Sequence, residues 1–226
     1  MEQNYKHIIW DWNGTLINDA KISYMLSMRE LELCGIPTMP ADEYRHKFHH
    51  PMKDFYQEIG VDYSKRSYQE ITDNFHKNYL LFLDDCYLFE DVLPTLQTIK
   101  DMGMTQSILS ALPHNILIRT IRDRHIENFF TDISGLATNA ADSKIGNAKK
   151  WFEKNNFDPS ELLMVGDTVH DFEVATALGI DCALIARGCQ HKDVLLKLEK
   201  PIFDSLDEFV SYLQKSEYLL KKEIHQ

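Results

Sequence analysis

The spacing of apolar residues divides the chain into a short opening strand, a helical block and a longer part in which helices and strands alternate. Residues 8–10 form an apolar run that is β-branched and aromatic and ends at a turn, which predicts a buried strand. From residue 17 to 89, apolar residues recur at helical spacing and no stretch favours a strand. Beyond about residue 90, short apolar runs alternate with amphipathic segments, as is typical of βαβ units.

Four helices are predicted within the helical block. The first carries its apolar residues from 22 to 33 and is ended by Gly35, and the second and third are expected at 42–48 and 53–59. The fourth begins at Ser67, where Glu70 completes a capping-box pattern. Four helices in one block indicate a separate helical unit.

The later part of the chain predicts a parallel sheet that is covered by helices on both faces. Strands are expected at 105–109, 131–136, 162–165, 180–185 and 202–203. Helices are expected at 92–102 with Asp91 as its cap, in a segment that begins near Pro113, and at 144–155, 172–178 and 206–213. The predicted fold is therefore α/β, with a doubly wound, Rossmann-like core formed by residues 1–16 and 90–216 and a helical cap formed by residues 17–89.

Polar side chains gather where the strands of this core are predicted to end, which is where open α/β sheets bind their ligands. Asp11 follows the first strand, Ser110 follows the second, and Asp167 and Asp171 follow the fourth, with Lys144 in the loop ahead of it. Three carboxylates provide the oxygen ligands that Mg²⁺ prefers. Lys144 could neutralise developing charge and Ser110 could donate a hydrogen bond to a phosphate oxygen.

Each of these residues also has an ordinary structural interpretation. Asp11 could cap the turn, Asp167 and Asp171 could cap the following helix, and Ser110 and Lys144 could be solvated groups at the ends of elements. We prefer the functional interpretation because the structural one requires all of these alternatives to be true at the same time.

Composition narrows the class of partner. The 226-residue chain has a formal net charge of −11, which argues against a nucleic acid or an anionic membrane but not against a small phosphorylated metabolite. No apolar run approaches the roughly 18 residues of a membrane span. The four cysteines form neither a CxxC pair nor a zinc-site spacing, so free thiols in the cytoplasm are expected. Monomer and homodimer both remain open.

Four motifs in order resemble those of the haloacid dehalogenase (HAD) superfamily, and specifically its phosphatases of the phosphoglycolate phosphatase type. The DWNGTL stretch that begins at Asp11 resembles the family's DxDGTL, and the GDTVHD stretch that begins at Gly166 resembles its GDxxxD. Ser110 and Lys144 match two single-residue motifs between them. The resemblance extends from about Lys6 to Leu213, and the helical insert resembles the family's cap.

The resemblance implies a Mg²⁺-dependent phosphatase that acts through an aspartyl-phosphate. Asp11 would be the nucleophile, and Mg²⁺ would be held by Asp11, the backbone carbonyl of Asn13, and Asp167, with Asp171 bound directly or through water. A divalent ion and a lysine would remove the repulsion between a carboxylate and a phosphate dianion. The residues implied to bind the phosphoryl group are Thr15, Ser110 and Lys144.

Asn13 departs from the family's pattern, because the phosphatases usually have a second Asp there as general acid and base. An amide cannot titrate in that role, and losing such help typically costs about 10²- to 10⁴-fold in rate. Three hypotheses follow: the substrate has a good leaving group such as an acyl phosphate, a cap residue among His49, His50 and Lys53 supplies the proton, or the domain is catalytically attenuated and binds a phosphorylated ligand or partner.

Overall fold

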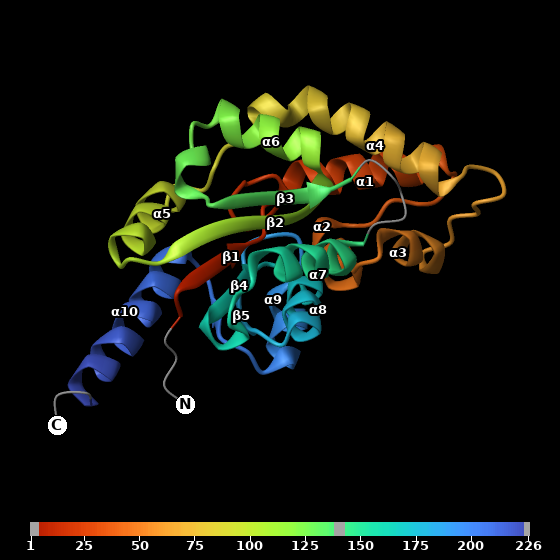
Figure 1. Cartoon of the computed structure of the whole chain (residues 1–226). Coiled ribbons are helices and arrows are strands. Elements are labelled where there is room, and N and C mark those ends of the chain that lie inside the picture. Colours follow the sequence, from red (N-terminus) through yellow and green to blue (C-terminus); the bar gives the residue numbers. More distant parts are fainter. Residues whose placement is uncertain (1–4, 138–142, 224–226) are drawn as a thin grey trace.

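The computed structural model describes residues 5–137 and 143–223, with side chains up to residue 215, and contains one six-stranded sheet (Figure 1). All neighbouring strands pair in parallel, in the order β3-β2-β1-β4-β5-β6. This is the order of a doubly wound sheet, whose winding direction reverses between β1 and β4. The predicted fold class is confirmed. The strands are β1 His7–Trp10, β2 Thr105–Pro113, β3 Asp132–Leu136, β4 Leu162–Gly166, β5 Asp181–Ile185 and β6 Ile202–Phe203.

Helices cover both faces of the sheet. Successive side chains of a strand point to opposite faces, so both faces carry apolar side chains that the helices bury. Ile8 and Trp10 of β1 belong to the larger apolar cluster, whereas Ile9 belongs to a second cluster on the other face. The first cluster receives α5 (Val92–Asp101), α6 (His114–Asp123) and α10 (Leu206–Glu223). The second receives α7 (Lys144–Asn155), α8 (Val169–Leu178) and α9 (Lys192–Leu195).

The segment between β1 and α5 is helical, as predicted. It contains α1 (Ala20–Leu33), α2 (Ala41–Lys47), α3 (Met52–Glu58) and α4 (Tyr68–Phe82), and α4 begins with the expected Ser67/Glu70 capping box. These helices share a third apolar cluster around Phe55 and Tyr56. Leu26 of α1 and Tyr79 of α4 also belong to the main core cluster. These two helices, the inner helices of the cap, therefore pack directly onto the sheet. Short 3-10 helices lie at Leu83–Asp85, Glu127–Phe129, Pro159–Glu161 and Leu196–Leu198.

Three predicted boundaries are wrong. Strand β2 continues past Ser110 to Pro113, with a register shift in its pairing to β3, so Ser110 lies inside a strand rather than after one. Helix α8 begins at Val169 instead of 172. Helix α10 extends from Leu206 to Glu223, well beyond the predicted end at Leu213.

Asp91 does not cap α5 with its side chain, contrary to the prediction. Its Oδ2 atom instead accepts hydrogen bonds from Arg187 Nη1 at 2.5 Å and from the backbone N–H of Leu206 at 2.8 Å. Local sequence places Asp91 at a helix start, but its partners lie about a hundred residues away. The side chain therefore ties α10 and the loop after β5 to the start of α5.

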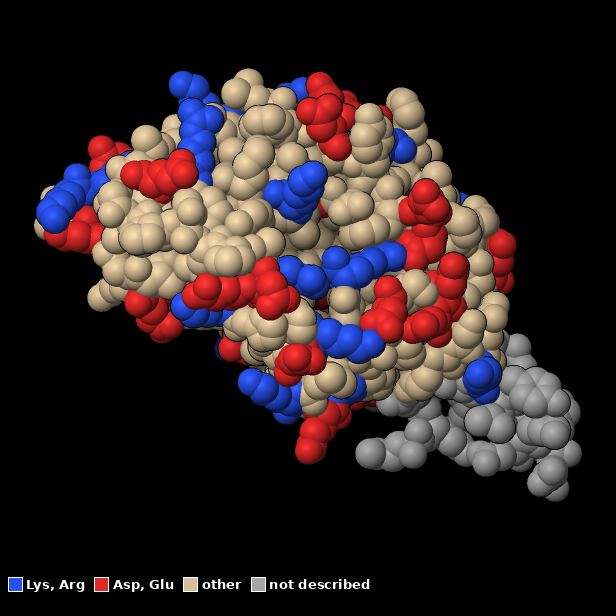
Figure 2. Space-filling view, turned by 180° about the vertical axis from the view of Figure 1, so that it is seen from behind, with Lys and Arg blue, Asp and Glu red and all other residues tan. Residues whose placement is uncertain are grey.

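The surface and the cysteines agree with the composition. On the face seen in Figure 2, Lys and Arg side chains are interspersed with Asp and Glu. Within the described part of the chain, no helix has the length and apolarity that a membrane span requires. All four cysteines are free.

His7 on β1 should make the fold sensitive to acid. Its ring nitrogens lie 2.7 Å from Thr105 Oγ1 and 2.8 Å from Ser107 Oγ, and burial lowers its pKa from 6.5 to about 4. Below pH 6.5 the unfolded chain therefore binds a proton that the folded chain does not, and stability is lost as the pH falls toward 4. Between pH 7 and pH 4.5, the free energy of unfolding should drop by about 2 to 3 kcal/mol more for the wild type than for His7→Gln. Urea unfolding at the two pH values measures this difference, and parallel losses in both proteins would contradict it.

Candidate active site

The candidate site lies at the switch point of the sheet, where β1 and β4 run side by side. Trp10 and Val165 are paired in register, and the backbone N–H of Asp11 donates to the Val165 carbonyl at 2.8 Å. Asp11 and Asp167 therefore leave neighbouring strands at the same edge of the sheet. Because both strands are buried apolar runs that end there, the sequence itself brings these carboxylates together.

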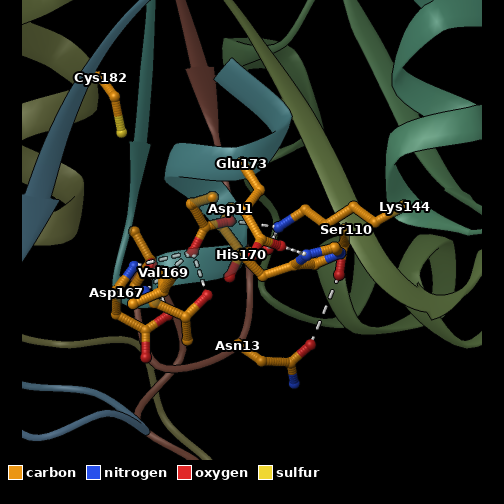
Figure 3. Close-up of polar contacts among 12 residues, drawn as sticks. Asp11, Asn13, Ser110, Lys144, Asp167, Val169, His170, Glu173 and Cys182 are labelled. Carbon is orange, nitrogen blue, oxygen red and sulfur yellow. Dashed lines mark hydrogen bonds and ion pairs between the residues drawn. The ribbon is translucent and has the colours of Figure 1, made fainter. Parts of the chain in front are cut away.

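Lys144 connects the acidic residues (Figure 3). It is the first residue of α7, is only 5% exposed, and places Nζ 2.6 Å from Asp11 Oδ1 and 2.5 Å from Asp171 Oδ1. The alternative interpretation of a solvated lysine is therefore wrong. A single buried ammonium group is shared by two carboxylates from different elements.

Asp171 both caps a helix and belongs to the charged cluster. Its Oδ2 atom accepts hydrogen bonds from the Thr168 backbone N–H at 3.0 Å and the Thr168 hydroxyl at 2.7 Å, at the start of α8. Its other oxygen faces Lys144. Asp167 has a different environment: Thr15 Oγ1 donates to its Oδ1 at 3.1 Å, and the Cys189 backbone N–H donates to its Oδ2 at 2.5 Å. The capping alternative thus applies to Asp171 only, and there it accompanies the charged contact.

Glycines make room for these carboxylates. A Cβ atom on Gly14 or on Gly188 would lie 2.4 Å or 2.0 Å from Asp167 Oδ2, and one on Gly166 would lie 2.1 Å from Asp171 Cγ. All three distances are far below van der Waals contact. The glycines in DWNGTL and GDTVHD therefore allow the backbone to approach the acidic groups closely.

The electrostatics show three carboxylates competing for one cation. Burial raises the pKa of Asp11 from 3.8 to about 7, although Lys144 opposes that shift, and burial together with Asp11 raises the pKa of Asp167 well above its usual value. For Asp171, burial is outweighed by the Lys144 ion pair and the Thr168 hydrogen bond, so its pKa is lowered. When all three carboxylates are ionised, the cluster carries more negative charge than Lys144 can balance.

This excess of negative charge fits a divalent cation. Asp11, Asp167 and Asp171 are all buried, and each offers an oxygen atom within 4.8 Å of the others. An all-oxygen donor set of this kind suits Mg²⁺. The arrangement is consistent with the metal site expected from the sequence.

Asn13 is held by a fully buried acidic residue that sequence reasoning missed. Its Nδ2 atom donates to Asp19 Oδ2 at 2.5 Å and to the Tyr79 hydroxyl oxygen at 3.1 Å. Asp19 also accepts hydrogen bonds from the Gly14 backbone N–H at 2.9 Å and the Tyr79 hydroxyl at 2.9 Å. The amide oxygen of Asn13 consequently faces Ser110, whose Oγ lies at 3.5 Å (Figure 3).

The cap contacts the core beside this cluster. The ring of His50 stacks on the ring of His170 at 4.8 Å, and the side chain of Gln190 bridges the two parts by donating to the Phe48 carbonyl at 2.7 Å and accepting from the Val169 backbone N–H at 2.6 Å. His170 is buried. The cap thus contacts the start of α8, the helix that carries Asp171.

The cap residues named as possible proton sources are placed unfavourably for that role. Burial, with His170 and Lys144 nearby, lowers the pKa of His50 to about 3, so its ring carries no acidic proton at neutral pH. His49 lies 3.1 Å from Glu58, and Lys53 is exposed.

The structure brings all seven predicted site residues to one place, while the residues that hold them come from distant parts of the chain. Asp19 could have been identified from the sequence, because it is an acidic residue only six positions after Asn13. No local signal indicates Tyr79, which comes from α4, or the backbone of Cys189. The assembled residues are Asp11, Asn13, Thr15, Ser110, Lys144, Asp167 and Asp171.

The fold and the site are those of one protein family. Residues 8–185 match the family model described as haloacid dehalogenase-like hydrolase, so the chain belongs to this family and is a hydrolase with phosphatase-like homologues.

Its relatives are distant. The chain is 22% identical to a phosphoglycolate phosphatase of Aliivibrio fischeri, with 97% of each chain covered. It is 25% identical to the tyrosine-protein kinase PtkA of Mycobacterium tuberculosis, covering 84% of this chain and 65% of that protein. Among solved structures, a predicted phosphatase from Clostridium acetobutylicum superposes with a TM-score of 0.79 at 15% identity, covering 93% of this chain and 99% of that one, which supports the fold alone.

Replacing Lys144 should expose the repulsion within the acidic cluster. Lys144→Met would leave Asp11 and Asp171 buried without their cation, and removing one partner of a buried ion pair typically costs about 3 to 5 kcal/mol. We expect a loss of that size in the free energy of unfolding in EDTA, and partial recovery on adding Mg²⁺, measured by urea unfolding. Lys154→Met is the matched control, since that exposed lysine lies on the same helix. Equal stability of the two variants would contradict the assignment.

Proposed function

We propose that the protein is a Mg²⁺-dependent phosphatase that hydrolyses a small phosphorylated metabolite through an aspartyl-phosphate, an acyl phosphate formed on Asp11. The observation that carries this proposal is the buried Lys144 ammonium group between Asp11 and Asp171. Phosphoryl transfer depends mainly on positioning and charge stabilisation, and this arrangement offers both at the edge of the sheet.

Asp11 is the residue we assign as nucleophile. Lys144 holds its Oδ1 atom, which leaves Oδ2 as the oxygen that attacks phosphorus. As the new O–P bond forms, the bond to the leaving oxygen breaks, and water then attacks phosphorus to release phosphate and restore the carboxylate. Lys144 stabilises the negative charge that gathers between Asp11 and the phosphoryl oxygens.

The proposed metal ligands are Asp11, Asp167, Asp171 and the backbone carbonyl of Asn13. Bound Mg²⁺ would neutralise phosphoryl oxygens and so reduce their repulsion with the nucleophile. We assign phosphoryl binding to Ser110, Lys144 and Thr15. The Thr15 hydroxyl already donates a hydrogen bond to Asp167. The Thr15 side chain would therefore act mainly by orienting Asp167 as a metal ligand.

Asn13 limits which substrates react quickly. With no carboxyl group at this position, the departing oxygen must leave without a proton from residue 13. An acyl or aryl phosphate tolerates this loss because its leaving group is stable as an anion, whereas an alkyl phosphate does not. We therefore favour a substrate with a good leaving group.

Asp19 supplies a physical reason for the amide. A carboxylate at position 13 would lie about as close to Asp19 Oδ2 as Asn13 Nδ2 does now, 2.5 Å, and two carboxylates at that distance cannot both ionise. An amide donates to Asp19 instead. In the single variant Asn13→Asp, the new carboxyl group would consequently share a proton with Asp19. The double variant N13D/D19N keeps one hydrogen-bond donor and one acceptor in this pair.

A catalytically attenuated domain that binds a phosphorylated ligand or partner is the second candidate. The observation that favours it is the same amide at position 13, together with the unfavourable placement of His49, His50 and Lys53 as substitutes for the missing acid.

The leaving-group dependence of the rate tests the proposal. For the wild type with Mg²⁺, kcat should fall steeply from acetyl phosphate through p-nitrophenyl phosphate to an alkyl phosphate such as phosphoglycolate. The N13D/D19N exchange should raise kcat on the alkyl phosphate by about 10²-fold or more, and much less on acetyl phosphate.

Controls separate the two candidates. Asp11→Asn should abolish turnover of every substrate, and full activity in that variant would contradict the mechanism. A wild type that is inactive on all three substrates, together with activity gained in the exchange variant, would favour the attenuated domain. Equal wild-type rates on acyl and alkyl phosphates would contradict the role given to Asn13.

A further inference from the structure

A second cluster of potential metal ligands lies where the cap meets the core, outside the acidic site. Asp42 and His46 stand one turn apart on α2, and His191 and Asp193 stand at the start of α9 (Figure 1). Asp42, His46 and His191 each offer a ligand atom, and these atoms lie within 4.8 Å of one another. None of the four residues belongs to the machinery proposed for phosphoryl transfer.

The four side chains are mutually close. The rings of His46 and His191 stack with centroids 3.8 Å apart. Asp42 lies 3.5 Å from His46 Nδ1 and 3.6 Å from His191 Nε2. Asp193 lies 3.9 Å from His46 Nε2 and 3.6 Å from His191 Nδ1. Two carboxylates thus surround two imidazole rings, and within the described part of the chain each carboxylate forms ion pairs with these rings alone.

The ring of His46 is prepared to bind a metal ion. Its Nδ1 atom lies 2.8 Å from the Asp42 backbone carbonyl, which can only accept a hydrogen bond, so Nδ1 carries the proton. In the neutral ring, Nε2 then has a free lone pair on the side of Asp193. Metal-binding histidines commonly donate their second nitrogen to a carbonyl in this way, which fixes both the tautomer and the ring orientation.

His191 would have to exchange one contact for a metal ion. Its Nδ1 atom accepts a hydrogen bond from the Asp193 backbone N–H at 3.1 Å and so caps α9. Ligation by Nδ1 would displace this bond, and ligation by Nε2 would require the ring proton to move to Nδ1.

The backbone around the cluster is already fixed across the boundary. The His191 N–H donates to the Arg45 carbonyl at 3.0 Å, and Arg45 Nη2 donates to the Gln190 carbonyl at 3.2 Å. The side chains of the cluster would have to move closer, and the stacked rings of His46 and His191 would have to turn, to reach the 2.0–2.2 Å bonds of zinc. Asp42 and Asp193 are exposed and can make that adjustment.

We propose that Asp42, His46, His191 and Asp193 form a binding site for a divalent transition-metal ion of the Zn²⁺ class, which would tie the cap to the core. Two imidazole and two carboxylate ligands suit Zn²⁺, Ni²⁺ or Co²⁺, whereas Mg²⁺ prefers oxygen ligands alone. The ion would join α2 to the start of α9 and strengthen a contact that is now made by the stacked rings of His46 and His191 and by hydrogen bonds.

Metal titration of the tag-free full chain tests this site. The protein is stripped with EDTA, dialysed into millimolar Mg²⁺ to occupy the oxygen-ligand site, and titrated with Zn²⁺ by calorimetry and with Co²⁺ by visible absorption. We expect one saturable Zn²⁺ per chain and Co²⁺ bands characteristic of nitrogen ligation. His46→Ala and His191→Ala should each weaken binding by about 10- to 100-fold or more.

His49→Ala is the matched control, because His49 is also a cap histidine paired with a carboxylate, Glu58 at 3.1 Å, but lies outside the cluster. It should bind Zn²⁺ as the wild type does. His46 is exposed on α2, so its variant should fold normally, as circular dichroism can verify. Absence of saturable Zn²⁺ binding, or equal affinity in the wild type, His46→Ala and His191→Ala, would overturn the proposal. Because the readout is metal binding and not turnover, failure of this proposal is distinct from failure of the phosphatase proposal.

Discussion

The shared contact of the Lys144 ammonium group with Asp11 and Asp171 is the interaction on which the rest of the site depends. Three carboxylates are buried at the edge of the sheet, and burial of unpaired negative charge is costly. Lys144 balances only part of that charge. Burial, together with the neighbouring carboxylates, raises the pKa of Asp11 and Asp167, and the excess of acidic groups suits a divalent cation.

A second buried contact, between Asn13 and Asp19, determines the kind of chemistry that we propose. The Asn13 amide is directed toward Asp19 and Tyr79 on its nitrogen side and toward Ser110 on its oxygen side. Residue 13 therefore presents an acceptor, not an acid, to the site. Tyr79 comes from α4, so the cap contributes directly to the position of this side chain.

Elements whose signal is local were predictable from the sequence. The apolar runs of β1 and β4, the turn glycines beside Asp11 and Asp167, and the Ser67/Glu70 capping box all act within a few residues. Together with the rule that ligands bind at strand ends, they predicted the fold class and brought the acidic residues together. The boundary between core and cap at residues 17 and 89 stays a prediction, since the inner cap helices share the main apolar cluster with the sheet.

Features that depend on distant partners could not be predicted in this way. Asp91 stands at a helix start but binds Arg187 and the backbone of Leu206. Pairing with β3 extends β2 past Ser110, where the apolar pattern alone ends. The stacking of His50 on His170 likewise depends on how the cap docks, which no spacing in either segment indicates.

The central claim, that Asp11 is the nucleophile and that Asn13 provides no acid or base for the second step, can be tested by trapping the phosphoenzyme. Wild-type protein turning over acetyl phosphate with Mg²⁺ is quenched in acid, and the peptide containing Asp11 is analysed by mass spectrometry. The account predicts phosphate on Asp11 in the wild type, less of it in N13D/D19N because water attacks faster, and none in Asp11→Asn. Turnover by the wild type with no phosphate on Asp11, and undiminished turnover by Asp11→Asn, would contradict it.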